Sequence, residues 1–236
     1  MTSVRIADDL AQVKERIAVA AAKAHREPDE ITLIGVSKNH PAEAIREAYA
    51  AGLRHFGENR VQEWEGKRGA LADIASQCLF HLIGHLQSNK AARAAKYFDR
   101  VDSVDSSSVA QKLDRATVEK SPGAKLPVLI EVHLGGEETK SGVADEQLVP
   151  LAEQISALPN LSLQGLMCIP PFTGNPEGAR AHFAHLRLLQ EKLRAHLRQE
   201  LPVLSMGMSH DFEIAIQEGA TEVRVGTALF GTRSLI

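Results

Sequence analysis

Eight short apolar runs, rich in β-branched residues, recur along the chain with amphipathic helical patterns between them. The runs cover residues 31–36, 53–57, 79–84, 100–104, 127–132, 161–167, 202–206 and 221–225. Several runs are continuously apolar, which is typical of strands buried on both faces of a parallel sheet. Strands that alternate with helices throughout one chain predict an α/β fold.

The segments between the runs carry apolar residues at helical spacing. Two complete stripes are Leu148, Leu151, Ala152 and Ile155, and Phe183, Leu186, Leu189 and Leu193. Such stripes predict helices with one buried face. A further helix is expected at residues 6–25, before the first strand. Gly52 and Gly219 each stand between a helical pattern and a strand, where a left-handed residue commonly ends a helix.

The chain length distinguishes between two parallel architectures. With 236 residues, eight βα units of about 25 residues approach the roughly 250 residues of a closed (β/α)8 barrel. An open doubly wound sheet would carry a glycine-rich first turn, but residues 36–41 read VSKNHP. We therefore predict a closed (β/α)8 TIM-type barrel with an additional N-terminal helix, forming a single domain over residues 1–236.

Composition excludes several classes of partner. The 27 Lys and Arg residues against 30 Asp and Glu residues give a net charge of −3, without the basic surface that nucleic-acid binding needs. Cys78 and Cys168 lie too far apart for a CxxC motif. His81 and His85 lack a third ligand at metal-binding spacing, so we expect no metal. Since the chain shows no secretory signal or membrane-spanning run, we expect a cytoplasmic protein.

Lys38 directly follows the first predicted strand. In a barrel of this type, functional residues gather where strands end. A lysine amine at the barrel mouth can lose its proton through desolvation and attack a carbonyl to form a Schiff base. The alternative is an ordinary solvated loop lysine.

The last two strands end in residues that suit an anion. Ser209 follows the seventh strand, and Gly226 and Thr227 follow the eighth. The loops after these strands, with a short extra helix, often bind phosphate because helix N-termini offer unpaired N–H groups. The alternative is that Ser209 caps a helix and Gly226 only permits a turn.

Arg224 alternates with Val223 and Val225, so we expect its side chain to face the barrel interior. A buried guanidinium needs an acceptor, either an atom of a ligand or a buried carboxylate. An amine, a phosphate site and an inward arginine together match the aldehyde, phosphate and ring nitrogen of pyridoxal 5′-phosphate.

Seven segments make the chain closely resemble the pyridoxal phosphate homeostasis protein family, in the family's own order. They are VSKNHP (36–41), FGENRVQE (56–63), FHLIGHLQSNK (80–90), TKSG (139–142), GLMCI (165–169), LSMGMSHDFEIAI (204–216) and VRVGTALFG (223–231).

The resemblance implies a fold-type III barrel, like the N-terminal domain of alanine racemase, with pyridoxal 5′-phosphate as cofactor. It implies a Schiff base on Lys38 and places Arg224 near the pyridine nitrogen and Asn59 beside the site. It also implies phosphate contacts from Ser209, Gly226 and Thr227. Because a guanidinium only donates hydrogen bonds, the pyridine nitrogen facing it must be unprotonated, and the ring is then a weak electron sink.

Three functions are compatible with this site: a cofactor holder, an amino-acid racemase and a class I aldolase. Racemisation needs a second acid or base opposite the lysine; in the resembling racemases it is a tyrosine from an additional β-domain. This chain has only Tyr49 and Tyr97, although His85 or Cys168 could act as an acid, and residues 226–236 leave no room for that domain. An aldolase would need a lysine within 161–167. We therefore expect a monomeric, non-catalytic holder that maintains pyridoxal phosphate levels and supplies apoenzymes.

Overall fold

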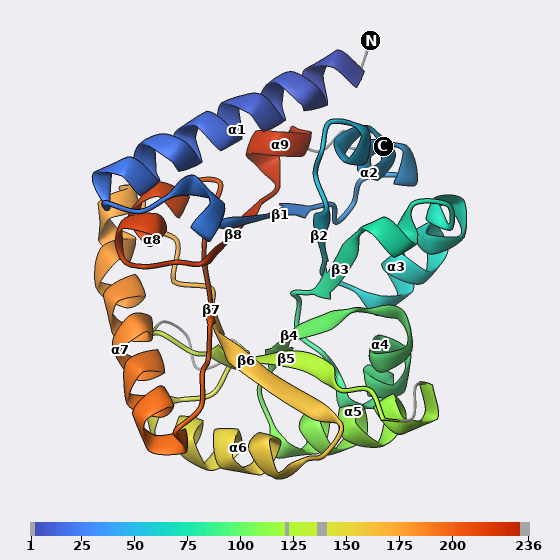
Figure 1. The fold of residues 1–236 in the computed structure, drawn as a ribbon, viewed down its shortest axis with the longest axis vertical. Helices are drawn as coiled ribbons and strands as arrows, with labels where there is room; N and C mark the ends of the chain where they lie inside the picture. Colours follow the sequence, from blue (N-terminus) through green and yellow to red (C-terminus); the bar gives the residue numbers. More distant parts are fainter. Residues whose placement is uncertain (1–2, 121–122, 136–140, 232–236) are drawn as a thin grey trace.

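The computed structural model describes residues 3–120, 123–135 and 141–231. Over this part of the chain, all the strands are parallel and pair in sequence order, with the last strand closing onto the first. The strands form a barrel and the helices surround it (Figure 1). The closed (β/α)8 barrel expected from the sequence is confirmed. Thr139 and Lys140 of the TKSG segment lie outside the described residues.

The ends of the strands agree with the sequence expectation to within two residues. The strands are β1 Thr32–Val36, β2 His55–Glu58, β3 Leu79–Leu82, β4 Arg100–Val104, β5 Leu126–Val132, β6 Leu161–Cys168, β7 Val203–Met208 and β8 Glu222–Val225. The α-helices are α1 Ser3–Lys23, α2 Ala42–Ala50, α3 Val61–Arg68, α4 Ala91–Tyr97, α5 Ser107–Lys120, α6 Asp145–Ala157, α7 Arg180–Leu197, α8 Phe212–Gln217 and α9 Thr227–Phe230.

The main hydrophobic core lies between the barrel and the helices. The predicted apolar stripes of α6 and α7 are buried there, which confirms their spacing as a core signal. The expected N-terminal helix is α1, and it packs against α2, α8 and α9 across the seam between β8 and β1 (Figure 1). Gly52 and Gly219 have φ angles of 100° and 99°, the left-handed conformation expected after α2 and α8.

Ionic groups fill the barrel interior near the amino ends of the strands. Arg100, which begins β4, donates to both carboxylate oxygens of Asp102 at 2.7 and 2.9 Å and to Oε1 of Glu222 at 2.8 Å. The rings of His55 and His81 lie beside them, with Nδ1 and Nε2 3.1 Å apart. Burial, aided by His81, lowers the pKa of His55 to about 4. This end of the barrel is therefore closed by polar side chains, and Arg100 pairs with both carboxylates there.

The pKa of Asp102 shows which interaction dominates in this cluster. Burial alone would raise it, but the charge of Arg100 and the hydrogen bonds from Arg100, with His81 Nδ1 3.9 Å away, hold it below its usual range. A carboxyl with a lowered folded-state pKa stabilises the fold above its unfolded-state pKa, and this contribution is lost as pH falls toward the folded value.

We predict that Arg100→Met destabilises the protein by about 3–5 kcal/mol at neutral pH, because two buried carboxylates lose their cation. The measurement is the free energy of unfolding in urea. The loss should shrink in acid, once Asp102 is protonated. Arg46→Met, which breaks an exposed ion pair with Asp73, is the control and should cost far less. Equal losses in the two variants would contradict the prediction.

Candidate functional site at the carboxyl ends of the strands

The register between β1 and β8 brings two predicted segments to one place on the rim. Ile34 pairs with Arg224 and Gly35 with Val225. The next residues, Val36 and Gly226, are also adjacent, since a Cβ on Gly226 would lie 3.4 Å from the Cβ of Val36. The turn after β1, which carries Lys38, therefore lies beside the start of α9.

Lys38 occupies a tight turn at this rim. The His40 N–H donates to the Ser37 carbonyl at 3.1 Å, and Asn39 has a φ of 61°, a left-handed conformation that asparagine tolerates better than most residues. Along β1, Ile34 faces the barrel interior, where it approaches Gly57. Alternation along the strand continues this interior side through Val36 to Lys38. The Lys38 side chain is half-buried.

The Ser209 hydroxyl and the backbone N–H groups at the N-terminus of α9 form a cluster of hydrogen-bonding groups, which we call the cup. The Ser209 Oγ accepts hydrogen bonds from the backbone N–H groups of Gly226 at 3.3 Å and Ala228 at 3.4 Å. Ser209 does not cap α8, because Asp211 holds that position. The N–H groups converge on a point where the Ser209 oxygen now lies, and an anion's oxygen can take its place. The sequence did not single out Ala228.

Thr227 is the first residue of α9 and is exposed at the edge of the cup. No hydrogen bond to another described residue engages its hydroxyl. The hydroxyl is therefore available to an anion that reaches the cup.

Arg224 faces the barrel interior as expected, while Val223 and Val225 join the outer core. The buried guanidinium donates to the Ser205 Oγ at 2.8 Å and to the Cys168 carbonyl at 2.7 Å. No carboxylate among the described residues lies within ion-pair distance of Arg224. From the sequence, the acceptor for Arg224 was either a ligand atom or a buried carboxylate. The described residues show no carboxylate bound directly to it.

Glu131 is a buried acid that sequence reasoning missed. It alternates in β5 with Ile130 and Val132 of the outer core, so it faces the barrel interior. The Ser141 hydroxyl donates to its Oε1 at 3.0 Å, and its Oε2 has no partner among the described residues. Burial raises the pKa of Glu131. A charged residue inside the apolar run 127–132 was the signal that could have found it.

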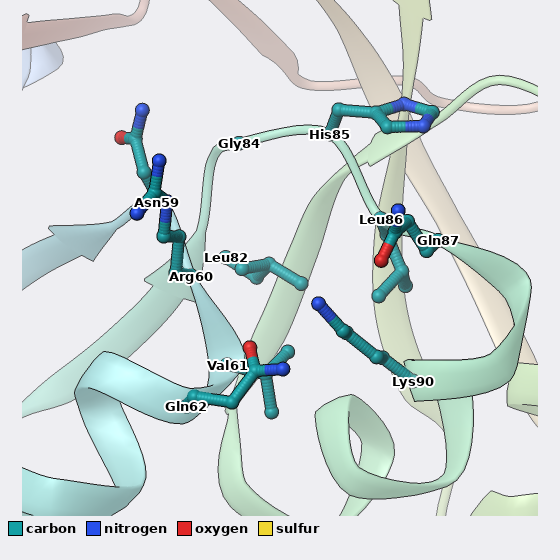
Figure 2. A pocket seen from close by; sticks show the side chains of 10 residues that line it. All are labelled: Asn59, Arg60, Val61, Gln62, Leu82, Gly84, His85, Leu86, Gln87 and Lys90. Atoms are coloured by element: carbon teal, nitrogen blue, oxygen red, sulfur yellow. The ribbon is translucent and has the colours of Figure 1, made fainter.

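Asn59 lies on the other side of Lys38 from the cup, because β2 and β8 flank β1 on opposite sides. It lines a cavity of about 340 Å³ together with Arg60, His85 and Lys90 (Figure 2). Its side chain points away from Lys90 in that view. Gly84 touches its backbone so closely that a Cβ would lie 2.4 Å from the Asn59 oxygen. The structure thus places Asn59 at the rim but apart from Ser209, Gly226 and Thr227.

The described residues contain no group of three His, Cys, Asp or Glu side chains arranged to hold a metal ion. None of their helices has the length and apolar character needed to cross a membrane.

Comparison with known proteins identifies close relatives. A family model described as the alanine racemase N-terminal domain matches residues 9–234. The pyridoxal phosphate homeostasis protein of Pseudomonas aeruginosa is 48% identical over 230 residues, covering 97% of this chain and 96% of the relative. The protein of that name from Escherichia coli K12 is 42% identical over 233 residues, covering 97% of each chain.

Solved structures agree with the fold. PipY of Synechococcus elongatus PCC7942, solved with PLP bound, is 42% identical with a TM-score of 0.84, and the match covers 96% of this chain and 100% of PipY. An alanine racemase of Clostridium difficile 630 has a TM-score of 0.74 at 18% identity, covering 97% of this chain and 57% of the racemase, and shares the fold alone. From its barrel and its identity to these relatives over nearly their full length, the chain belongs to the pyridoxal phosphate homeostasis protein family, within the group defined by the alanine racemase N-terminal domain.

Proposed function

We propose that this protein holds pyridoxal 5′-phosphate at the barrel rim, without turning over a substrate, and so maintains the supply of the cofactor to apoenzymes. The observation that carries the proposal is the cup in which Ser209 meets the N–H groups of Gly226 and Ala228, just after Arg224 in the chain and beside the end of β1, the strand that leads to Lys38. The names of the relatives and the PLP-bound state of PipY support it.

The residues present fit the cofactor's charged and polar ends. Backbone N–H groups with the hydroxyls of Ser209 and Thr227 suit a phosphate dianion, which is also favoured by the positive end of a helix. Among the described residues, Arg224 has neutral hydrogen-bond acceptors and no bound carboxylate, so its charge and remaining N–H donors suit an unprotonated ring nitrogen. We assign Asn59 to the opposite wall of the site.

Lys38 holds the cofactor covalently in this proposal. When bound, the cofactor supplies an aldehyde, with which the lysine amine can condense as water is released. The half-buried side chain of Lys38 lies at the rim between the cup and Asn59, so it needs no change of fold to reach a molecule gripped by Ser209.

The tyrosines support a holder over a racemase. Tyr49 is close to the C-terminus of α2 and Tyr97 ends α4, so both lie toward the amino ends of the strands, away from the rim. The Tyr49 hydroxyl donates to Gln77 at 2.7 Å.

Cys168 is also a poor acid because burial raises its thiol pKa to about 12. His85 is exposed and lies 3.1 Å from an Asp105 oxygen.

The alternative function is a fold-type III enzyme such as an amino-acid racemase. One observation favours it: Glu131 is a buried acid inside the barrel with one oxygen that no described residue engages. Burial raises its pKa, which favours the protonated form that a general acid needs.

In the cell, the chain works as a cytoplasmic monomer in which residues 1–236 form one cofactor-binding domain. The net charge of −3 and the lack of a basic run support exchange with protein partners rather than with nucleic acid.

We predict that Ser209→Ala weakens pyridoxal 5′-phosphate binding roughly ten- to a hundredfold, because a hydrogen bond to a charged group is lost. Thr227→Val should weaken it in the same direction. Pyridoxal, which has no phosphate, should bind all variants as it binds the wild type. Fluorescence titration measures both ligands, and Ser156→Ala, at an exposed helix position, is the control. Unchanged affinity in Ser209→Ala would place the phosphate elsewhere.

We predict no amino-acid turnover by the loaded protein beyond that of free pyridoxal 5′-phosphate. The measurement is chiral chromatography after incubation with each amino acid, with Lys38→Ala as the control. Robust racemisation that Glu131→Gln removes would establish the alternative function and refute the holder.

A further inference from the structure

A buried ionic network lies directly behind the turn that carries Lys38. Its centre is Lys67 of α3, whose Nζ donates to the Ser37 carbonyl at 2.9 Å, to Glu58 Oε1 at 2.9 Å and to Glu63 Oε1 at 2.6 Å. The Lys67 side chain is 11% exposed and that of Glu58 is fully buried. All three donor positions of the ammonium are therefore used within the protein.

The same network holds the chain on both sides of Lys38. On one side, the Ser37 hydroxyl donates to Glu58 Oε1 at 2.7 Å. On the other side, the Asn39 N–H donates to Glu63 Oε1 at 2.5 Å. Lys38 is the single residue between these two attachment points. Its neighbours are fixed by side chains from β2 and α3, while its own side chain remains on the barrel side of the turn.

The helix that carries the network is itself firmly placed. Glu63 and Lys67 are four residues apart, so they share one face of α3. Val61 and Trp64 bury another face in the core, and the Trp64 indole donates to the Tyr97 carbonyl at 2.8 Å. The network therefore ties the turn to a rigid element rather than to a loop.

Stability alone is a weak reason for such a network. The free energy needed to remove a lysine and a glutamate from water offsets most of the free energy of their attraction. Apolar side chains of similar size in the same place often give a fold of equal stability. Burial raises the pKa of Glu58, and its Oε2 finds no partner among the described residues. What the network supplies is fixed geometry at the Ser37 and Asn39 backbone.

We infer that Lys67 is a positioning residue for the amine of Lys38. By bracketing the turn, Lys67 and its partners Glu58 and Glu63 hold the Lys38 side chain at the angle from which it meets the cofactor's carbonyl carbon. This inference rests on the proposed function. The carbon–nitrogen bond forms from Lys38 Nζ and the carbonyl oxygen leaves as water, with no oxidant or reductant; Lys67 takes no part in the bond.

The positioning of Lys38 should matter for the binding of a ligand that condenses with its amine, but not for the binding of a ligand that cannot condense. A preorganised amine raises the effective concentration of the attacking group. Pyridoxamine 5′-phosphate has the same phosphate and ring but an amine in place of the aldehyde, so it cannot condense with Lys38. Loss of positioning should weaken pyridoxal 5′-phosphate binding and leave pyridoxamine 5′-phosphate binding unchanged.

The test compares both ligands in Lys67→Met, Lys67→Arg and Glu63→Ala. We expect Lys67→Met to weaken pyridoxal 5′-phosphate binding by on the order of tenfold or more, with slower growth of the visible absorbance of the lysine adduct. Lys67→Arg should recover part of the loss, because a guanidinium can reach the same acceptors. Glu63→Ala frees only the Asn39 side and leaves Lys67 paired with Glu58, so it tests the idea in a protein that stays folded.

Lys112→Met is the matched control, since Lys112 is also a lysine that donates to a serine, here to the Ser88 hydroxyl at 3.0 Å, but on an exposed surface. The inference is overturned if both ligands weaken equally in the folded Glu63→Ala protein, or if neither weakens in any Lys67 variant. Failure of the proposed function is a different result: the wild type itself would then bind both ligands alike and develop no visible absorbance.

Discussion

Pairing between β1 and β8 closes the barrel, and its register decides where every group of the site lies. Ile34 against Arg224 and Gly35 against Val225 leave the two strand ends level at the rim. Lys38 then emerges from β1 beside the first turn of α9, and Arg224 lies beneath both. A shift by one residue would turn Arg224 into the outer core and exchange it with a valine. The amine, the cup and the buried cation are therefore consequences of one long-range pairing.

The polar groups at the amino ends of the strands stabilise the fold, whereas those at the carboxyl ends are suited to bind a ligand. At the amino ends, Arg100 satisfies Asp102 and Glu222, and two histidine rings complete a closed polar layer. At the carboxyl ends, the described partners of the Arg224 guanidinium and of the Ser209 hydroxyl are neutral, and Glu131 keeps one oxygen without a described partner. Buried charges that are paired hold a fold together, whereas charged and polar groups with remaining hydrogen-bonding capacity can receive a ligand. The Lys67 network combines both roles, because its buried and paired charges hold the turn that carries the binding residue Lys38.

Local patterns in the sequence predict the barrel well, because strand runs and helix stripes such as that of α7 depend only on nearby residues. They also predict the inward side of Arg224, which follows from alternation. They fail where partners are distant in the chain. Ser209 looks like a helix cap, yet its hydroxyl contacts residues 17 and 19 positions away. The contact of Lys67 with Ser37 depends on how α3 crosses the end of β1, which no local pattern records.

The central claim is that Lys38 is the group to which the cofactor becomes attached. It is tested most directly by adding pyridoxal 5′-phosphate to the wild-type protein, reducing with borohydride and locating the added mass by peptide mass spectrometry. We predict a pyridoxyl phosphate label on the peptide that contains Lys38, at one label per chain. A label spread over surface lysines, or no label with the protein still folded, would contradict the account.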